Sequence, residues 1–339
     1  MTNLTKTYNI LIRTLIISVT YGFILYEIFG QQSVIKPLIN LQQRFSDSGF
    51  AMSATLLILL MIVNWSLEAI KWRFLISKFE KISFLTSMQA VFSGLTVSIF
   101  TPNRIGEYFG RVFILKQINP LKGILITILG SMAQLVVYLL SGLICFVYFL
   151  DHYVGAPAFF GSYFSGIAYL SVIGFALIIT GLFMNVSFIT GIANRILSRK
   201  WRKLRHYLKT FSLFSKKELL IVLLISALRY CVFTFQYYFL LKYFGIDLPA
   251  FQLIIAIAVI FFIMTAIPTF ALAELGIRST VAVWVIGTML KVNGQDASSA
   301  TIAIITSASA LWVINLGIPA LIGSAFVMKL RFFKKTNTI

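Results

Sequence analysis

The stretch TPNRIGEYFGR, residues 101–111, interrupts a sequence that is otherwise apolar enough to lie in a lipid bilayer. A fainter copy, IPTFALAELGIR, follows at residues 267–278. Each copy has a proline, then a glutamate, and then an arginine four residues after that glutamate. We expect both copies to be broken helix starts inside a membrane that face one shared site.

The composition predicts an all-α polytopic membrane protein. Of the 339 residues, 59% are hydrophobic and only 12% are charged, and the mean hydropathy is +0.92. Apolar runs of about 20 residues recur from end to end, which a water-soluble core does not explain. A membrane β-barrel would instead show segments of roughly ten residues that alternate polar and apolar side chains. The unbroken apolar blocks therefore favour helices.

The charge distribution indicates a membrane surface rather than a nucleic acid as the partner. The chain has 29 Lys and Arg against 10 Asp and Glu, a formal net charge of +19, but the basic residues lie between apolar spans. In that place they set the topology and favour an anionic leaflet. The densest basic segment runs from Arg195 to Lys217, and we expect it to contact that leaflet.

The sequence contains no pattern for a metal, a redox centre or a nucleotide. Cys145 and Cys231 lie within apolar spans without a CxxC spacing, and His152 and His206 stand far apart. No G-x-x-x-x-G-K-[ST] loop occurs in the chain. We therefore expect no cofactor, no ATP hydrolysis by this chain, and a transporter-like protein rather than an enzyme.

Six full crossings and two returning hairpins satisfy the positive-inside rule. The crossings are expected at residues 10–29, 50–67, 123–150, 165–188, 218–242 and 297–328, and the hairpins at 83–116 and 248–290. The basic residues after the second crossing, Lys71 among them, mark the cytoplasmic side. If the first hairpin crossed once, the nine basic residues at 195–217 would sit outside. The second hairpin must also return for both termini to be cytoplasmic, as expected in an inner membrane.

The order of span, hairpin and span occurs twice. We divide the single membrane domain into a signal-anchor helix and loop (1–49), repeat A (50–150), a linking helix with the basic segment (151–217), repeat B (218–328) and a basic tail (329–339). A shift of 167 residues places Glu107 on Glu274 and Arg111 on Arg278. Because the copies insert from opposite faces, they form an inverted-topology repeat, which is typical of carriers with a site near the midplane.

Prolines are expected to break the helix at both copies of the motif. Pro102 and Pro268 remove a backbone donor and disfavour helix in the preceding residue, so a new helix should begin just after each. Such a start offers free N–H groups and the positive end of a helix dipole to an anion. Gly106 and Gly110 leave a bare face for a neighbouring helix or a lipid chain.

Five charged side chains accompany the two breaks. Arg104, Glu107 and Arg111 fall at i, i+3 and i+7 on one expected helix face. Glu274 and Arg278 pair at i and i+4. A charge at the bilayer centre costs about 2.5–3.5 kcal/mol, so these groups need one another, water or a ligand. Two glutamates against three arginines leave one positive charge, which suits phosphate.

The alternative is a set of structural salt bridges that hold the hairpins closed. Arg104 has no expected same-face partner other than Glu107, so we expect it to be the free anion ligand. Arg229 lies in mid-span with no neutralising neighbour in sequence, and we expect it to face the interior beside a glutamate. Glu68, near a span end, either lines the pathway or snorkels to the surface. Three amides are expected to form hydrogen bonds between helices: Asn64, Gln134 and Asn315.

The TPNRIGEYFGR stretch, the later AELGIR stretch and the two-hairpin layout resemble the transmembrane region of bacterial lysylphosphatidylglycerol synthases, a family of flippase-like membrane proteins. The resemblance covers nearly the whole chain. The family's proline, arginine, glycine and glutamate match Pro102, Arg104, Gly106 and Glu107. A glycine-rich turn is expected before the second glutamate, whereas residues 270–273 of this chain are Phe-Ala-Leu-Ala.

The resemblance implies a flippase that moves an anionic or aminoacylated phospholipid, or a polyprenyl-phosphate lipid, between leaflets of the inner membrane. Full synthases add a soluble aminoacyl-transfer domain, and this chain ends eleven residues after its last span, so we do not expect it to synthesise lipid alone. Arg104, Arg111 and Arg278 are the expected phosphate contacts. The alternative is a non-transporting partner that docks a lipid- or glycan-modifying enzyme through the basic segment. An oligomer is compatible with either function.

Overall fold

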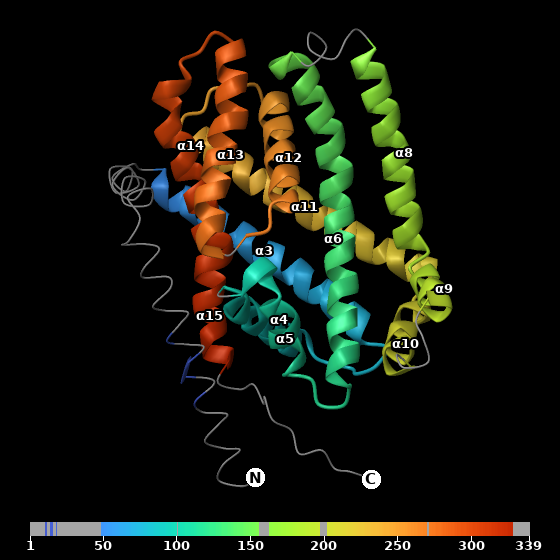
Figure 1. Ribbon diagram of the computed structural model, residues 1–339. Coiled ribbons are helices and arrows are strands. Elements are labelled where there is room, and N and C mark those ends of the chain that lie inside the picture. Colours follow the sequence, from blue (N-terminus) through green and yellow to red (C-terminus); the bar gives the residue numbers. More distant parts are fainter. Residues whose placement is uncertain are drawn as a thin grey trace.

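The computed structural model describes residues 11, 14–15, 18, 49–99, 101–155, 163–196, 202–269 and 271–327, and within them every regular element is a helix (Figure 1). The first half contains α3 (Phe50–Ile76), α4 (Phe84–Ser98), the short helix η1 (Pro102–Arg104), α5 (Gly106–Val112), α6 (Pro120–Phe149) and the π-helical turn η2 (Leu150–Val154). The linking segment contains α8 (Phe164–Met184), α9 (Ser187–Ile196), α10 (Arg202–Leu208) and η4 (Lys209–Leu213). The second half contains α11 (Lys216–Tyr243), α12 (Ala250–Ala266), α13 (Ala271–Val292), α14 (Ala297–Trp312), the π-helical turn η5 (Val313–Gly317) and α15 (Ile318–Val327).

Side-chain caps in the sequence place several helix starts. The Ser83 hydroxyl accepts a hydrogen bond from the third residue of α4. Ser215 and Glu218 form a reciprocal capping box at the start of α11. The Asp296 carboxylate accepts two backbone amides at the start of α14. These caps satisfy amides that the first helical turn leaves without intrahelical partners.

Six helices are long and apolar enough to cross a membrane, and the chain is an integral membrane protein. They cover Phe50–Ile76, Pro120–Val154, Ser165–Met184, Lys216–Tyr243, Ala273–Val292 and Ala297–Val327. Large apolar side chains stand on their outer surfaces: on α8, Leu170 is 71% exposed and Leu177 is 70% exposed. A continuous surface of that kind is unfavourable in water and matches lipid.

These six helices differ from the six predicted crossings at one place. The crossing predicted at residues 10–29 lies outside the described residues, apart from positions 11, 14, 15 and 18. The helix without a predicted crossing is α13, which belongs to the second predicted hairpin and is long enough to span a membrane alone. In the first hairpin α4 has 15 residues. It rises about 22 Å, less than a hydrocarbon core of about 30 Å. Helix length therefore distinguishes the two hairpins.

The first hairpin returns to the point where it starts. Glu80 lies in the turn that follows α3, and its buried carboxylate accepts hydrogen bonds from the backbone amides of Lys116, Gln117 and Ile118 at 2.8–3.3 Å. Residues 80 and 118 bracket α4, η1 and α5. One buried carboxylate therefore joins the entry and the exit of this segment.

The second hairpin is closed in a similar way. The side chains of Gln252 and Asn293 exchange hydrogen bonds, with Asn293 Nδ2 2.8 Å from Gln252 Oε1. The Gln295 side-chain amide donates to the Asp247 carbonyl oxygen at 3.0 Å. The segment formed by α12 and α13 therefore leaves and rejoins the rest of the chain at neighbouring points.

The entry and exit of the first hairpin lie near one end of α6, and those of the second hairpin lie near the other end. The exit of the first hairpin leads directly into the start of α6 at Pro120. Near the other end of α6, the rings of Tyr148 and Phe149 pack edge-on against Phe251 of α12 and Trp284 of α13, with centroids 5.9 and 5.2 Å apart. Figure 1 shows α4 and α5 beside one half of α6, and α12 and α13 beside the other half.

The hairpin tips meet between these two ends. The backbone amide of Asn103 donates to the Thr269 carbonyl oxygen at 3.0 Å, and the Thr269 amide donates to Asn103 Oδ1 at 3.1 Å. Asn103 directly follows Pro102, and Thr269 directly follows Pro268. The two motifs are thus in contact although 166 residues separate the bonded pair.

Packing between the halves is reciprocal. α6 of the first half packs on α12 of the second, α15 of the second half packs on α4 of the first, and α3 and α11 pack on each other. A glycine permits each of the first two contacts. An added Cβ at Gly142 would lie 2.3 Å from the Cβ of Phe262, and one at Gly323 would lie 2.1 Å from the Phe92 carbonyl oxygen. Each half therefore supplies a helix that covers the hairpin of the other.

Replacing Gly323 with alanine is expected to destabilise the fold by about 1–3 kcal/mol, because the new methyl group overlaps the backbone of α4 and forces α15 outward. The matched control is Gly174→Ala on α8, where no atom lies within 4 Å of the added methyl group. Thermal unfolding of both variants in detergent measures the difference. An unchanged midpoint for Gly323→Ala would contradict the close approach of α4 and α15.

Candidate functional site

The first break contains two consecutive residues with left-handed backbone angles. Asn103 has a φ of 50° and Arg104 a φ of 56°, and α5 begins only at Gly106. Residues with a Cβ rarely adopt such angles, and asparagine tolerates them best. The turn directs Arg104 away from the helix that carries Glu107 and Arg111. The prediction that these three charges share one helix face is therefore wrong for Arg104.

Thr101 caps the helix that follows the break. Its hydroxyl oxygen accepts a hydrogen bond from the Gly106 amide at 2.8 Å, so this amide is not offered to an anion as predicted. Gly106 and Gly110 pack against α4. An added Cβ at these positions would lie 2.3 Å from the Val97 carbonyl oxygen and 2.6 Å from the Gly94 Cα, respectively. Of the two predicted uses of the bare glycine face, helix packing is the one that these contacts show.

Arg104, Glu274 and Arg278 form a charged group that we call the tip cluster. Arg104 Nη2 lies 2.9 and 2.6 Å from the two carboxylate oxygens of Glu274. Arg278 Nη2 lies 2.5 Å from Glu274 Oε1. Glu274 and Arg278 are buried, whereas the side chain of Arg104 is 35% exposed. The cluster joins the first hairpin to the second, so Arg104 is paired and is not the free ligand that the sequence predicted.

A second charged group, the α3 cluster, consists of Glu68, Lys71, Glu107, Arg111 and Arg229. The Glu68 carboxylate forms ion pairs with Lys71 at 2.7 Å, Arg111 at 2.8 Å and Arg229 at 3.0 Å. Arg111 also pairs with Glu107. Glu68, Lys71 and Arg111 are all buried. One carboxylate thereby connects α3, α5 and α11, and it supplies the glutamate that was expected beside Arg229.

Amide side chains continue from Arg229 into the core. Arg229 Nε donates to Asn64 Oδ1 at 3.0 Å, and Asn64 Nδ2 donates to Asn315 Oδ1 at 3.1 Å. Asn315, which stands in the π-helical turn η5, donates to Gln236 Oε1 at 3.0 Å. Gln236 in turn donates to the Leu57 carbonyl oxygen at 2.9 Å. π-Helical turns often occur at functional sites, and here the turn holds a residue of the buried polar chain.

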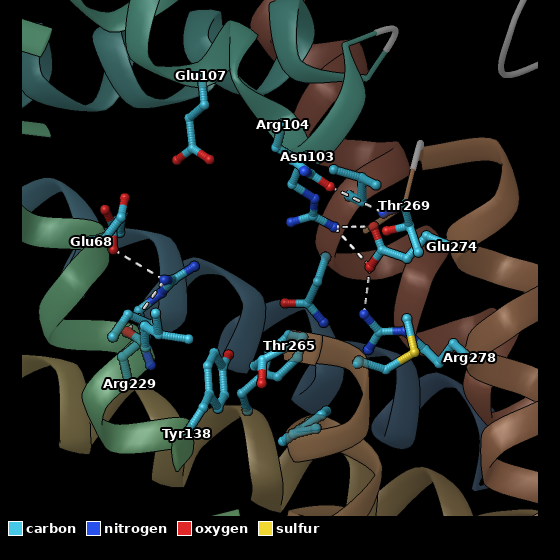
Figure 2. Close-up of a pocket in the computed structure, with 18 of the residues that line it drawn as sticks. Glu68, Asn103, Arg104, Glu107, Tyr138, Arg229, Thr265, Thr269, Glu274 and Arg278 are labelled. Atoms are coloured by element: carbon cyan, nitrogen blue, oxygen red, sulfur yellow. Dashed lines mark hydrogen bonds and ion pairs between the residues drawn. The ribbon is translucent and has the colours of Figure 1, made fainter. Parts of the chain in front are cut away.

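A cavity of about 590 Å³ lies between the two clusters. Figure 2 shows Arg104, Glu274 and Arg278 on one side of it, and Glu68 with Arg229 on the other. Its volume falls within the range of about 300–1,000 Å³ that is usual for ligand sites. α6 contributes a largely apolar and aromatic wall: Ile128, Met132, Leu135 and Tyr138. The cavity therefore combines charges from both hairpins with an apolar surface.

The structure brings together most of the side chains that the sequence singled out. Of the six charged side chains that the sequence assigned to the site, five line the cavity: Arg104, Glu107, Arg229, Glu274 and Arg278. Arg111 lies behind this surface, in contact with Glu68 and Glu107. Pro268 also lines the cavity, whereas Pro102 and Gly106 form the break in the first hairpin.

For Glu68 the sequence left two alternatives, lining the pathway or snorkelling, and the structure places it on the cavity wall, whereas Lys71 was not assigned to the site. Lys71 belongs to the basic residues predicted to mark the cytoplasmic side, but α3 continues to Ile76 and buries it against Glu68. The i, i+3 spacing of the two residues is the signal that indicates their pairing, provided that the helix extends beyond the apolar run. Gln134, one of the three predicted amides, donates to the Ser226 carbonyl oxygen of α11 at 3.3 Å.

The chemistry of the site rests on guanidinium, ammonium and carboxylate groups. Within the described part of the chain, no three His, Cys, Asp or Glu side chains converge where a metal ion would bind. The guanidinium groups of Arg104, Arg229 and Arg278 face a shared space. A planar guanidinium donates two parallel hydrogen bonds to phosphate or carboxylate, so the arrangement suits such an anion.

Comparison with known proteins identifies a family. The family model described as "Lysylphosphatidylglycerol synthase TM region" matches residues 10–317. No match was found among curated proteins or solved structures. The matched segment includes both hairpins and all the residues of the tip cluster and the α3 cluster.

Glu68→Gln is expected to destabilise the protein by about 3–5 kcal/mol, because two buried cations, Lys71 and Arg111, and the partly buried Arg229 lose the carboxylate that they share. The matched control is Glu218→Gln, which removes a partly exposed ion pair with Lys78 and keeps a capping side chain. It should cost less than about 1 kcal/mol. Unfolding in mixed detergent and SDS micelles compares the two. A loss at Glu68 no larger than that at Glu218 would show that the shared carboxylate is not structurally important.

Proposed function

Since the chain belongs to the lysylphosphatidylglycerol synthase transmembrane-region family, we propose that it moves a phosphate-bearing lipid between the leaflets of the bacterial inner membrane. The family places it among membrane proteins of lipid metabolism or translocation. The observation that carries the proposal is the cavity between the hairpins, because it gathers arginines from both of them inside the membrane domain. Buried charges inside a membrane domain are costly unless they bind a ligand or pair with one another.

An amphipathic substrate fits the borders of this cavity. Leu135 on α6 lines the cavity and is exposed, and Ile105 and Phe109 of the first hairpin are also exposed. We propose that the acyl or prenyl chains stay against such side chains in the bilayer while the headgroup enters the cavity. The tails then never cross a polar region, and only the headgroup needs a protein path.

The contact between Arg104 and Glu274 links headgroup binding to opening between the hairpins. Arg104 is the most exposed member of the tip cluster, so an incoming phosphate competes with Glu274 for it. Exchange of one anion for another keeps Arg104 paired throughout. Loss of the Glu274 contact also loosens the hairpin tips, so the ligand stabilises a more open arrangement of the two halves.

The proposal includes two re-entrant hairpins in an inverted-topology repeat. It is supported by two observations. The entry and exit of each hairpin meet at opposite ends of α6, and the hairpin tips meet between those ends. The basic side chains where the first hairpin begins and ends support a cytoplasmic position for that part of the hairpin. Among them is Lys78, which lies 2.7 Å from Glu218 at the start of α11. Both termini and the anionic leaflet bound by the 195–217 segment then lie on this side.

Cysteines introduced as Lys81→Cys and Lys116→Cys, on the two sides of the first hairpin, should react with a membrane-impermeant maleimide from the cytoplasmic face. Both positions are exposed, and the segment between them returns to its start. Asp247→Cys, where the second hairpin begins and ends, should react from the opposite face. The native cysteines are first replaced by serine. Labelling of positions 81 and 116 from different faces would exclude the proposed topology.

Leaflet exchange in proteoliposomes tests the proposed function. With fluorescent phosphatidylglycerol and dithionite quenching, we expect Arg104→Ala and Arg229→Gln each to lower the initial rate by about tenfold or more, because a charged hydrogen bond to phosphate is lost. Lys242→Gln is the matched control, since Lys242 is a described cation outside the cavity and should leave the rate unchanged.

Equal rates for both arginine variants and the unaltered chain would overturn the assigned mechanism. Absence of leaflet exchange by the isolated chain, together with tight co-purification of one lipid- or glycan-modifying enzyme, would favour the non-transporting partner.

A further inference from the structure

The charges around the cavity divide into two groups, each with a surplus of one positive charge. In the tip cluster, Arg104 and Arg278 stand against Glu274. In the α3 cluster, the three cations Lys71, Arg111 and Arg229 stand against the two carboxylates Glu68 and Glu107. Figure 2 shows open space between the groups, and no ion pair among the described residues joins one cluster to the other.

The other acidic residues in the described part of the chain are engaged elsewhere. Glu80 binds three backbone amides, Glu218 pairs with Lys78, and Asp296 caps α14. Asp151 accepts a hydrogen bond from Ser165, and Asp247 pairs with Lys242. None of these five acids lines the cavity. Within the described residues, both positive surpluses therefore lack a protein counter-charge.

Buried N–H donors on the cavity wall also lack acceptors within the described structure. They are Nε of Arg278 in the tip cluster and the indole nitrogens of Trp65 and Trp312. The Trp65 ring packs under the Arg229 guanidinium at 4.9 Å, which puts its N–H on the side of the α3 cluster. Buried donors are rarely left unpaired in proteins. These nitrogens have almost no accessible surface, so an acceptor oxygen in the cavity would reach them only after a small shift of the surrounding side chains.

Resting on the proposed transport of a phosphate-bearing lipid, we propose that the preferred substrate carries two phosphate groups, one for each cluster. One phosphate contacts Arg104 and Arg278, and the other contacts Arg229. Two kinds of lipid share this chemistry: a diphosphate ester of a polyprenyl chain and a bis-phosphatidyl lipid of the cardiolipin type. In both, a short bridge links the phosphates, so that both phosphates can lie within one cavity of about 590 Å³.

A single phosphate satisfies only one of the two clusters. Charges interact strongly where water is excluded, so the cluster that stays without an anion keeps an unfavourable surplus. A phosphomonoester that carries both negative charges on one group overcompensates its own cluster and leaves the other unchanged. Two phosphates on opposite sides place negative charge at both surpluses together.

Binding measured by native mass spectrometry distinguishes these cases. The complete chain in detergent is titrated with geranylgeranyl diphosphate, geranylgeranyl monophosphate, tetraoleoyl cardiolipin and dioleoyl phosphatidylglycerol. We expect at least one two-phosphate probe to bind about tenfold or more tightly than its single-phosphate counterpart. The pair of probes that shows the preference identifies the kind of lipid.

Variants in each cluster test the two-point contact. Arg278→Gln and Arg229→Gln should each reduce the preference to less than about twofold, because one phosphate loses its partner. Lys242→Gln, outside the cavity, should leave the preference unchanged. If Arg229→Gln does not fold, Glu107→Gln replaces it. That variant adds one positive charge to the α3 cluster and should widen the preference.

Equal affinity for single- and two-phosphate probes, or a preference that survives both arginine variants, would overturn this proposal. If phosphatidylglycerol still exchanged between leaflets in the same preparation, that result would support the proposed translocation even though the two-phosphate preference is absent. A two-phosphate preference without any leaflet exchange would support the site and contradict translocation.

Discussion

The ion pair between Arg104 and Glu274 is the contact on which the arrangement of the two halves depends. It joins hairpins that are 170 residues apart, with Arg104 Nη2 2.6 Å from Glu274 Oε2. Neither charge is favourable alone at the depth of a membrane. Each hairpin is therefore completed by the other, and the neighbouring backbone contact between Asn103 and Thr269 fixes their relative position. The contacts that join the two hairpins therefore also form part of the cavity wall.

The two copies of the motif lie in different charged surroundings. Arg111 of the first half reaches Glu68 on α3. When the sequence is aligned on itself with a shift of 167 residues, Phe235 of α11 takes the position of Glu68. Arg278 therefore has no corresponding carboxylate on α11, and it shares Glu274 with Arg104. This difference leaves Arg104 and Arg278 on the cavity wall, whereas Arg111 lies behind it. A headgroup between the halves therefore meets a different set of charges on each side.

Hydropathy and proline positions predict the helices and the breaks, because membrane-spanning helices need long apolar runs and prolines interrupt them. Pairing partners are less predictable. Spacing along a helix assigns Arg104 to Glu107, but the left-handed angles at residues 103 and 104 turn it to Glu274 of the other hairpin. Glu68 is similar, since its partners come from α5 and α11 as well as from α3. Such contacts depend on tertiary packing, which local spacing does not specify.

Cryo-electron microscopy of the chain in nanodiscs that contain a phosphate-bearing lipid is the decisive measurement for a headgroup site between the hairpins. We expect headgroup density inside the cavity, with a phosphate oxygen within about 3 Å of the Arg104 or Arg229 guanidinium and the Arg104–Glu274 contact lengthened. A cavity without lipid density, with Arg104 still paired to Glu274 and phosphates confined to the outer surface, would contradict it.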